Sequence, residues 1–180
     1  AVEKAAQPLR VETPKHKHLF SSRQAQNANT VVDLGDGVTI GGGQLALIAG
    51  PCAIEQEDEV FALARALADA GVSILRGGVY KPRTSPFSFQ GLEESGFALM
   101  DRVRKETGLK FVTEAMDERS LELVDEHADM IQIGARNMHN YAFLKKVGKA
   151  SKPVLLKRGF SATVDELLLA ADYILAGGNT

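Results

Sequence analysis

The chain has 180 residues, 44% of them hydrophobic and 24% charged, which is the composition of one ordinary globular domain able to bury a core. Its formal net charge of −2 argues against a general nucleic-acid or membrane partner, and its single Cys excludes an intrachain disulfide. No apolar run approaches the roughly 20 residues of a membrane span, so we expect a cytoplasmic protein.

The chain divides into a polar N-terminal part and a patterned remainder. Residues 1–29 lack a sustained hydrophobic period and are predicted to form an arm or linker. Residues 30–43 alternate apolar and polar side chains around Gly35-Asp36-Gly37, which predicts a β-hairpin. We expect residues 30–180 to form one domain.

From residue 45 onward, apolar runs alternate with amphipathic segments. The amphipathic segments begin or end at typical helix signals, such as the Thr163-x-x-Glu166 capping box and the glycines at 71, 108 and 148. Strands that alternate with such helices predict a parallel sheet. The runs that we expect to be buried strands are LALIAG (45–50), ILRGG (74–78), FVTEA (111–115), MIQIG (130–134) and PVLLKRG (153–159).

The pattern contains five strand–helix units, whereas a closed (β/α) barrel has eight. Two folds are compatible with it. One is a (β/α)8 TIM barrel of which about five units are present, apparently incomplete at its C-terminal side. The other is an open five-stranded α/β sheet, which needs a reversal of strand order to form its site.

Residues suited to catalysis stand at the end of each predicted strand. These strand-end residues are Cys52, Arg76, Glu114, Arg136 and Lys157, and Ala135 adds a backbone amide next to Arg136. Carboxyl ends of parallel strands meet at one edge of a barrel, where active sites form. Clustered Arg and Lys side chains indicate an anionic, phosphorylated substrate.

The segment after the second strand adds further polar groups within a few residues. Lys81, Pro82, Arg83, Thr84 and Ser85 supply two cations and two hydroxyls in a stiff loop, which suits a phosphorylated polyol. A charged surface loop is the alternative.

Three single residues keep alternative roles at this stage. Cys52 can bind a metal, act as a nucleophile or be a small buried hydrophobe. Glu114 either pairs with a nearby cation or acts as an acid, base or water-holding group. Lys157 and Arg158 are adjacent, so only one can face the barrel mouth; Lys157 could form a Schiff base or anchor a charge.

Taken together, the motifs resemble those of class I 3-deoxy-D-arabino-heptulosonate-7-phosphate (DAHP) synthases, in the short microbial form related to octulosonate-8-phosphate synthases. The resemblance covers about residues 30–180. The matching motifs, in chain order, are Gly50-Pro51-Cys52, Leu75-Arg76-Gly77-Gly78, Lys81-Pro82-Arg83-Thr84-Ser85-Pro86 with Ser88-Phe89-Gln90-Gly91, Val112-Thr113-Glu114-Ala115, Gln132-Ile133-Gly134-Ala135-Arg136-Asn137 and Leu156-Lys157-Arg158-Gly159.

This resemblance implies a fold and a reaction. The fold would be a TIM barrel with an N-terminal β-hairpin over its bottom. The enzyme would be a metal-dependent transferase that condenses phosphoenolpyruvate with erythrose 4-phosphate and water, the first step of the shikimate pathway to aromatic amino acids. We also expect a homo-oligomer.

The resemblance also implies roles for individual residues. Cys52 would be one ligand of a divalent metal (Mn, Fe, Co or Zn), and Glu114 would position the attacking water. Phosphoenolpyruvate would be held by Arg76, Lys81, Ala135, Arg136 and Lys157, and erythrose 4-phosphate by Pro82, Arg83, Thr84 and Ser85. Lys81 would lie between the two substrates, and Lys157 would be an anchor, not a Schiff base.

Other functions remain as alternatives. An octulosonate-8-phosphate synthase is less favoured because that family has an Asn-containing loop where this chain has Lys81-Pro82-Arg83-Thr84-Ser85. A Schiff-base aldolase and a non-catalytic phosphometabolite-binding fragment are the others. The family's remaining metal ligands, a His, a Glu and an Asp, cannot be mapped onto this sequence, so we expect these residues alone to be poorly active.

Overall fold

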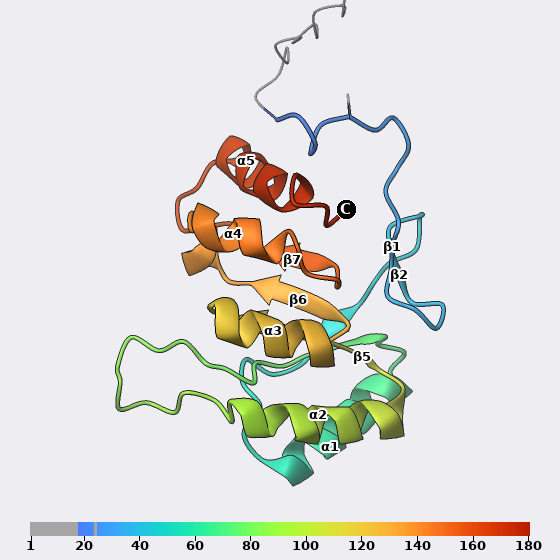
Figure 1. Cartoon of the computed structure of the whole chain (residues 1–180). Coiled ribbons are helices and arrows are strands. Elements are labelled where there is room, and N and C mark those ends of the chain that lie inside the picture. The colour runs from blue at the N-terminus through green and yellow to red at the C-terminus, as the bar shows by residue number, and fades with distance from the viewer. Residues whose placement is uncertain (1–17, 24) are drawn as a thin grey trace, which may run out of the picture.

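The computed structural model describes residues 18–23 and 25–180 (Figure 1). Within these residues the hairpin strands are β1 (Val32–Asp33) and β2 (Thr39–Ile40). The alternating elements that follow are β3 (Ile48–Ala49), α1 (Glu57–Asp69), β4 (Ile74–Arg76), α2 (Glu94–Thr107), β5 (Lys110–Ala115), α3 (Glu118–His127), β6 (Met130–Ile133), the short 3-10 helix η1 (Ala135–Asn137), α4 (Tyr141–Val147), β7 (Val154–Leu156) and α5 (Val164–Leu175). No helix of this described part is long and apolar enough to cross a membrane.

The sheet confirms the barrel interpretation over the open-sheet alternative. In the described residues the strand order is β3-β4-β5-β6-β7, and all neighbouring pairs are parallel. Each strand therefore lies beside the one that precedes it in the chain. No reversal of strand order is present among them, so there is no switch point, and the chain forms an arc of a (β/α) barrel.

The central strands are buried as predicted, but the first one is not. β5 and β6 consist almost entirely of buried residues. The predicted strand at 45–50 is reduced to the two residues of β3, and Leu45 is 85% exposed. Among the described strands β3 pairs only with β4, so its other edge and much of its apolar surface lie open.

Helix ends agree with the signals in the sequence. The Thr163 hydroxyl accepts the N–H of Glu166, and the Glu166 carboxylate accepts the N–H of Thr163, so the predicted capping box starts α5. Asp117 and Ser120 form a second capping box at α3. α2 ends at Gly108, whose φ of 71° is the left-handed conformation that favours glycine.

The hairpin closes the end of the sheet at which the strands begin. Leu34, at the start of its turn, packs in a buried cluster with Ile74, Val112 and Met130. The Lys110 ammonium, on β5, lies 2.7 Å from the Asp36 carboxylate in the hairpin turn. In Figure 1 the hairpin and the long connection between β4 and α2 lie at opposite ends of the strands, so the connection is at their carboxyl ends.

Part of the predicted N-terminal arm contacts the last helix. Residues 1–17 and 24 lie outside the described residues. The backbone N–H groups of Leu19 and Ser21 donate to the Asp172 carboxylate of α5, and the Ser21 hydroxyl donates to the Leu168 carbonyl. The segment around Leu19 is therefore fixed to α5 by hydrogen bonds.

Candidate active site

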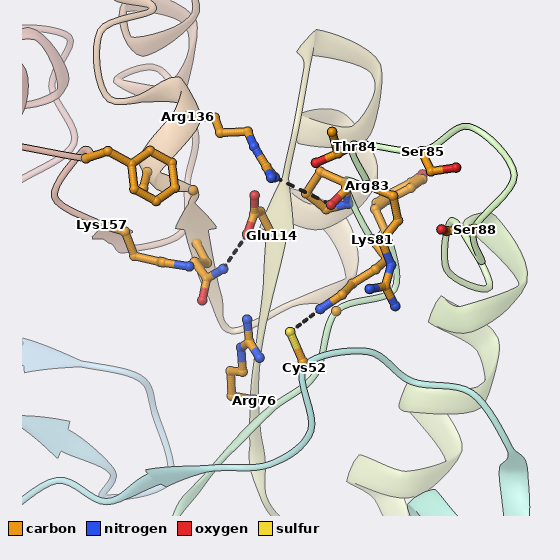
Figure 2. Close-up of a pocket in the computed structure, with 17 residues that line it drawn as sticks. Cys52, Arg76, Lys81, Arg83, Thr84, Ser85, Ser88, Glu114, Arg136 and Lys157 are labelled. Atoms are coloured by element: carbon orange, nitrogen blue, oxygen red, sulfur yellow. Dashed lines mark hydrogen bonds between the residues drawn. The ribbon is translucent and has the colours of Figure 1, made fainter.

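A cavity of about 550 Å³ lies at the carboxyl ends of the sheet strands (Figure 2). Every residue that the sequence predicted for the site contributes to its wall. These are Cys52, Arg76, Lys81, Pro82, Arg83, Thr84, Ser85, Glu114, Ala135, Arg136 and Lys157. The structure thus brings together groups that are as much as 105 positions apart in the chain, from Cys52 to Lys157.

Each wall residue is placed by the end of a strand. Arg76 is the last residue of β4, Glu114 is the penultimate residue of β5, and η1 after β6 presents Ala135 and Arg136. Lys157 follows β7 directly and lines the cavity, whereas its neighbour Arg158 is not among the lining residues. The prediction that only one of the two faces the barrel mouth is confirmed, and that residue is Lys157.

The cations of this cavity have no carboxylate partners in the part of the chain that the structure describes. Within residues 18–23 and 25–180, none of Arg76, Lys81, Arg83, Arg136 and Lys157 forms an ion pair. Three of these side chains donate instead to backbone carbonyls: Arg76 to Pro51 at 3.0 Å, Arg83 to Phe89 at 3.3 Å and Arg136 to Pro82 at 3.4 Å. These bonds orient the guanidinium groups and leave their positive charge for an anionic ligand.

Cys52 lies against two of these cations. The Lys81 ammonium contacts the Cys52 sulfur (Figure 2). Hydrogen bonds from Lys81 and then from Arg76 hold the pKa of the Cys52 thiol below its ordinary value. The side chain is exposed rather than a buried hydrophobe, so the thiolate form is favoured at a position open to the cavity.

The described residues do not by themselves fit a metal site. No group of three His, Cys, Asp or Glu side chains among them is arranged to hold an ion. Divalent transition metals in proteins take about four or more ligands, and Cys52 would supply one. We therefore derive no chemical step through a metal.

Glu114 is held by a neighbour whose role the sequence analysis missed. Gln132 is 3% exposed, and its amide nitrogen donates to the Glu114 carboxylate at 2.6 Å. None of the described cations forms an ion pair with Glu114, so of the two alternatives left open by the sequence, pairing with a cation is not observed. The sequence signal for this role was the polar Gln132 in the middle of the apolar run MIQIG (130–134).

Further wall residues had not been assigned to the site. They are Gly78, Tyr80, Ser88, Gln132, Gly134 and Phe160. Burial raises the pKa of the Tyr80 phenol, so this hydroxyl stays protonated at neutral pH and can donate a hydrogen bond. At Gly78, a Cβ would lie 2.8 Å from the Cys52 and Tyr80 carbonyl oxygens, so this glycine is required by the chain's own packing.

Comparison with known proteins agrees with this geometry. The family model described as the DAHP synthetase I family matches residues 23–180. The chain belongs to this family. The curated phospho-2-dehydro-3-deoxyheptonate aldolase of Thermotoga maritima is 51% identical over 159 residues, covering 88% of this chain and 47% of that protein. A 2-dehydro-3-deoxyphosphooctonate aldolase of Syntrophotalea carbinolica is 33% identical over 150 residues, 79% of this chain and 54% of that one.

Solved structures of DAHP synthases show the same arrangement of elements. The crystal structure of the Thermotoga maritima enzyme matches with a TM-score of 0.85 at 48% identity, over 91% of this chain and 47% of that one. A truncated form of a synthase from the same organism matches with a TM-score of 0.78 at 47% identity, over 88% of this chain and 57% of that one. The chain spans about half the length of the curated relatives that it matches.

Proposed function

We propose that this protein is a 3-deoxy-D-arabino-heptulosonate-7-phosphate synthase, a transferase of the shikimate pathway. It joins phosphoenolpyruvate, erythrose 4-phosphate and water to give the seven-carbon keto-acid phosphate and inorganic phosphate. The observation that supports this most is the cavity wall: five of its cations have no carboxylate ion-pair partner among the described residues, and Glu114 is the one carboxylate that these residues contribute to it. That charge distribution suits two phosphorylated substrates.

The side chains divide into two sets around Lys81. Arg76, Arg136 and Lys157 line one side and hold the phosphate and carboxylate of phosphoenolpyruvate, with the Ala135 N–H as a further donor. Pro82, Arg83, Thr84 and Ser85 form the loop that binds erythrose 4-phosphate. Lys81 lies between the sets and offsets the repulsion of the two anions as they approach.

The bond changes follow from the products. The third carbon of phosphoenolpyruvate bonds to the aldehyde carbon of erythrose 4-phosphate, and the water oxygen adds to the second carbon. The bond from that carbon to the phosphate oxygen then breaks, which leaves the keto group and releases inorganic phosphate. Glu114 holds the water and accepts the first of the two protons that it loses. One of these protons ends on the former aldehyde oxygen, which becomes a hydroxyl, and the other on the departing phosphate.

Phosphate release by the purified protein tests this proposal. We expect release only when phosphoenolpyruvate and erythrose 4-phosphate are both present. Release with phosphoenolpyruvate alone would indicate a phosphatase. Because we expect these residues alone to be poorly active, the assay uses high protein concentration and long incubation, and no release with both substrates under those conditions would contradict the proposal. An eight-carbon product needs a five-carbon aldehyde, so preference for a five-carbon aldose phosphate would favour an octulosonate synthase.

Lys157 and Arg158 form a matched pair for testing the site. We expect Lys157→Met to weaken phosphoenolpyruvate binding by about tenfold or more, because it removes a charge-assisted contact. Arg158→Met removes an adjacent charge outside the cavity wall and should change the affinity little. Isothermal titration calorimetry measures both, and equal losses would contradict the assignment. Borohydride trapping of substrate on Lys157 would favour the Schiff-base aldolase instead.

Three expectations stay predictions: that the enzyme depends on a metal with Cys52 as a ligand, that it is a homo-oligomer, and that it is cytoplasmic. Dialysis against a chelator should abolish phosphate release, and Mn, Fe, Co or Zn should restore it. Release that is unchanged after chelation would argue against the metal. Light scattering of the purified protein gives the oligomeric state.

A further inference from the structure

Glu114 is held by a hydrogen bond from the neighbouring strand β6 and lies against the residue that follows this strand. In the parallel pair of β5 and β6, Glu114 is the register partner of Gln132. The Gln132 amide donates to Glu114 Oε2 at 2.6 Å. Gln132 is 3% exposed and the bond is partly buried, so bulk water competes with it less than with an exposed hydrogen bond.

Gly134 provides the space for the same carboxylate. It lies two positions after Gln132, directly after β6 and before η1. A Cβ at Gly134 would lie 2.1 Å from Glu114 Oε1 and 2.7 Å from its carboxyl carbon. The backbone of Gly134 has φ −68° and ψ 156°, which any residue adopts. Glycine is thus needed here for the room that Glu114 occupies and not for its backbone conformation.

We propose that Gln132 and Gly134 are positioning residues that set the direction of the Glu114 carboxylate, an inference that rests on the proposed function. Gln132 occupies Oε2, and Gly134 lets Oε1 lie directly over the backbone of the chain after β6. Oε1 has no hydrogen-bond partner among the described residues, so it is the oxygen that receives the water and its proton. The amide fixes which oxygen reacts and where it lies.

Removal of the amide tests this role. Gln132→Met keeps the length of the side chain and removes the donor. We expect kcat for phosphate release to fall by about tenfold or more, because a misdirected catalytic group is costly. The affinity for phosphoenolpyruvate, measured by calorimetry, should stay within about twofold, because the cations that bind it are untouched. Gln56→Met is the matched control, since Gln56 is exposed and its side chain makes no capping bond to α1.

Gly134→Ala gives an independent test. The atoms that an alanine methyl would meet are the end of the flexible Glu114 side chain, so the carboxylate can swing away and the fold is retained. We expect unchanged thermal unfolding, unchanged phosphoenolpyruvate affinity and a kcat lower by about tenfold. An unchanged kcat in either variant, or a kcat that falls together with the affinity, would overturn the inference.

A double-mutant cycle separates positioning from general packing. If Gln132 acts only through Glu114, Gln132→Met costs no further activity in a Glu114→Gln background. A purely structural role would reduce kcat in both backgrounds and would overturn the inference while the proposed function stands. A wild-type protein that releases no phosphate would refute the proposed function and this inference with it.

Discussion

Asp129 provides the sharpest test of what holds the sheet together. Its side chain, directly before β6, is 10% exposed. One oxygen accepts the backbone N–H of Phe111 at 2.8 Å, and the other accepts Arg104 at 2.7 Å and lies 3.8 Å from the Lys110 ammonium. Asp129→Ala would therefore remove the acceptor of the Phe111 backbone N–H in β5. It would also leave Lys110, whose side chain is 10% exposed, with Asp36 as its ion-pair partner among the described residues.

The magnitude follows from burial. An unpaired buried N–H at Phe111 costs about 1–3 kcal/mol. The larger cost of stranding a buried charge does not arise, because Lys110 keeps the closer of its two carboxylates, Asp36 at 2.7 Å. Arg104 keeps its hydrogen bond to the His127 carbonyl, so losing the contact between Arg104 and Asp129 costs little. Because Lys110 keeps Asp36 and Arg104 keeps the His127 carbonyl, no charge is left without a partner, and we expect Asp129→Ala to lower the free energy of unfolding by about 1–3 kcal/mol, mainly through the Phe111 N–H.

Urea denaturation measures this loss, and Asp36→Ala is the control. Asp36 contacts the same ammonium, but its side chain is 89% exposed, so its removal should cost much less. Asp129→Asn should fall between the two because it can still accept the Phe111 N–H. If Asp129→Ala and Asp36→Ala destabilise the protein equally, burial does not set the strength of these contacts and the reasoning is wrong.

Two further predictions concern pKa shifts. Cys52 is the single Cys of the chain, so intact mass follows its alkylation. Because Lys81 and Arg76 lower the pKa of this thiol, its rate of alkylation should level off at a lower pH than that of an ordinary thiol. Lys81→Met should move this pH–rate profile to higher pH, and an identical profile in the variant would argue against the contact between Lys81 and Cys52. Hydrogen bonds from the Ser120 N–H and hydroxyl lower the pKa of Asp117 in the folded protein. The stability that the ionised Asp117 carboxylate contributes is therefore present above its ordinary pKa and is lost as the pH falls through the lower folded-state pKa. Asp117→Ala should cost about 1 kcal/mol at pH 7 and less in strong acid, and an equal loss by urea denaturation at both would contradict this.

Much of the fold could be predicted because local signals agree with the tertiary arrangement. The capping box at Thr163 and the left-handed glycine at Gly108 mark helix ends where the structure has them. Strand order was left open by the sequence, since an apolar run does not say which run lies beside it. The exposure of Leu45 was also missed, because an edge strand and a central strand have the same composition when neighbours are unknown.

The site residues that stand at strand ends could be predicted from the sequence. The residues whose role depends on contacts between neighbouring strands were predicted less well. Every candidate residue lines one cavity because parallel strands place their carboxyl ends together. Gln132 was missed because its partner, Glu114, is on a different strand, and register is a tertiary property. Gly134 was part of a motif, yet its reason, the room for a carboxylate, exists only in three dimensions.

The order of the strands has a consequence for how the chain folds. In the described sheet each strand pairs with the one that precedes it in the chain. The paired residues therefore have modest sequence separation, and the loop-closure entropy lost on pairing is small. The sheet can therefore grow in one direction as residues leave the ribosome. Arg76, Glu114, Arg136 and Lys157 would join the cavity in that order, and its positive charge would accumulate stepwise during synthesis.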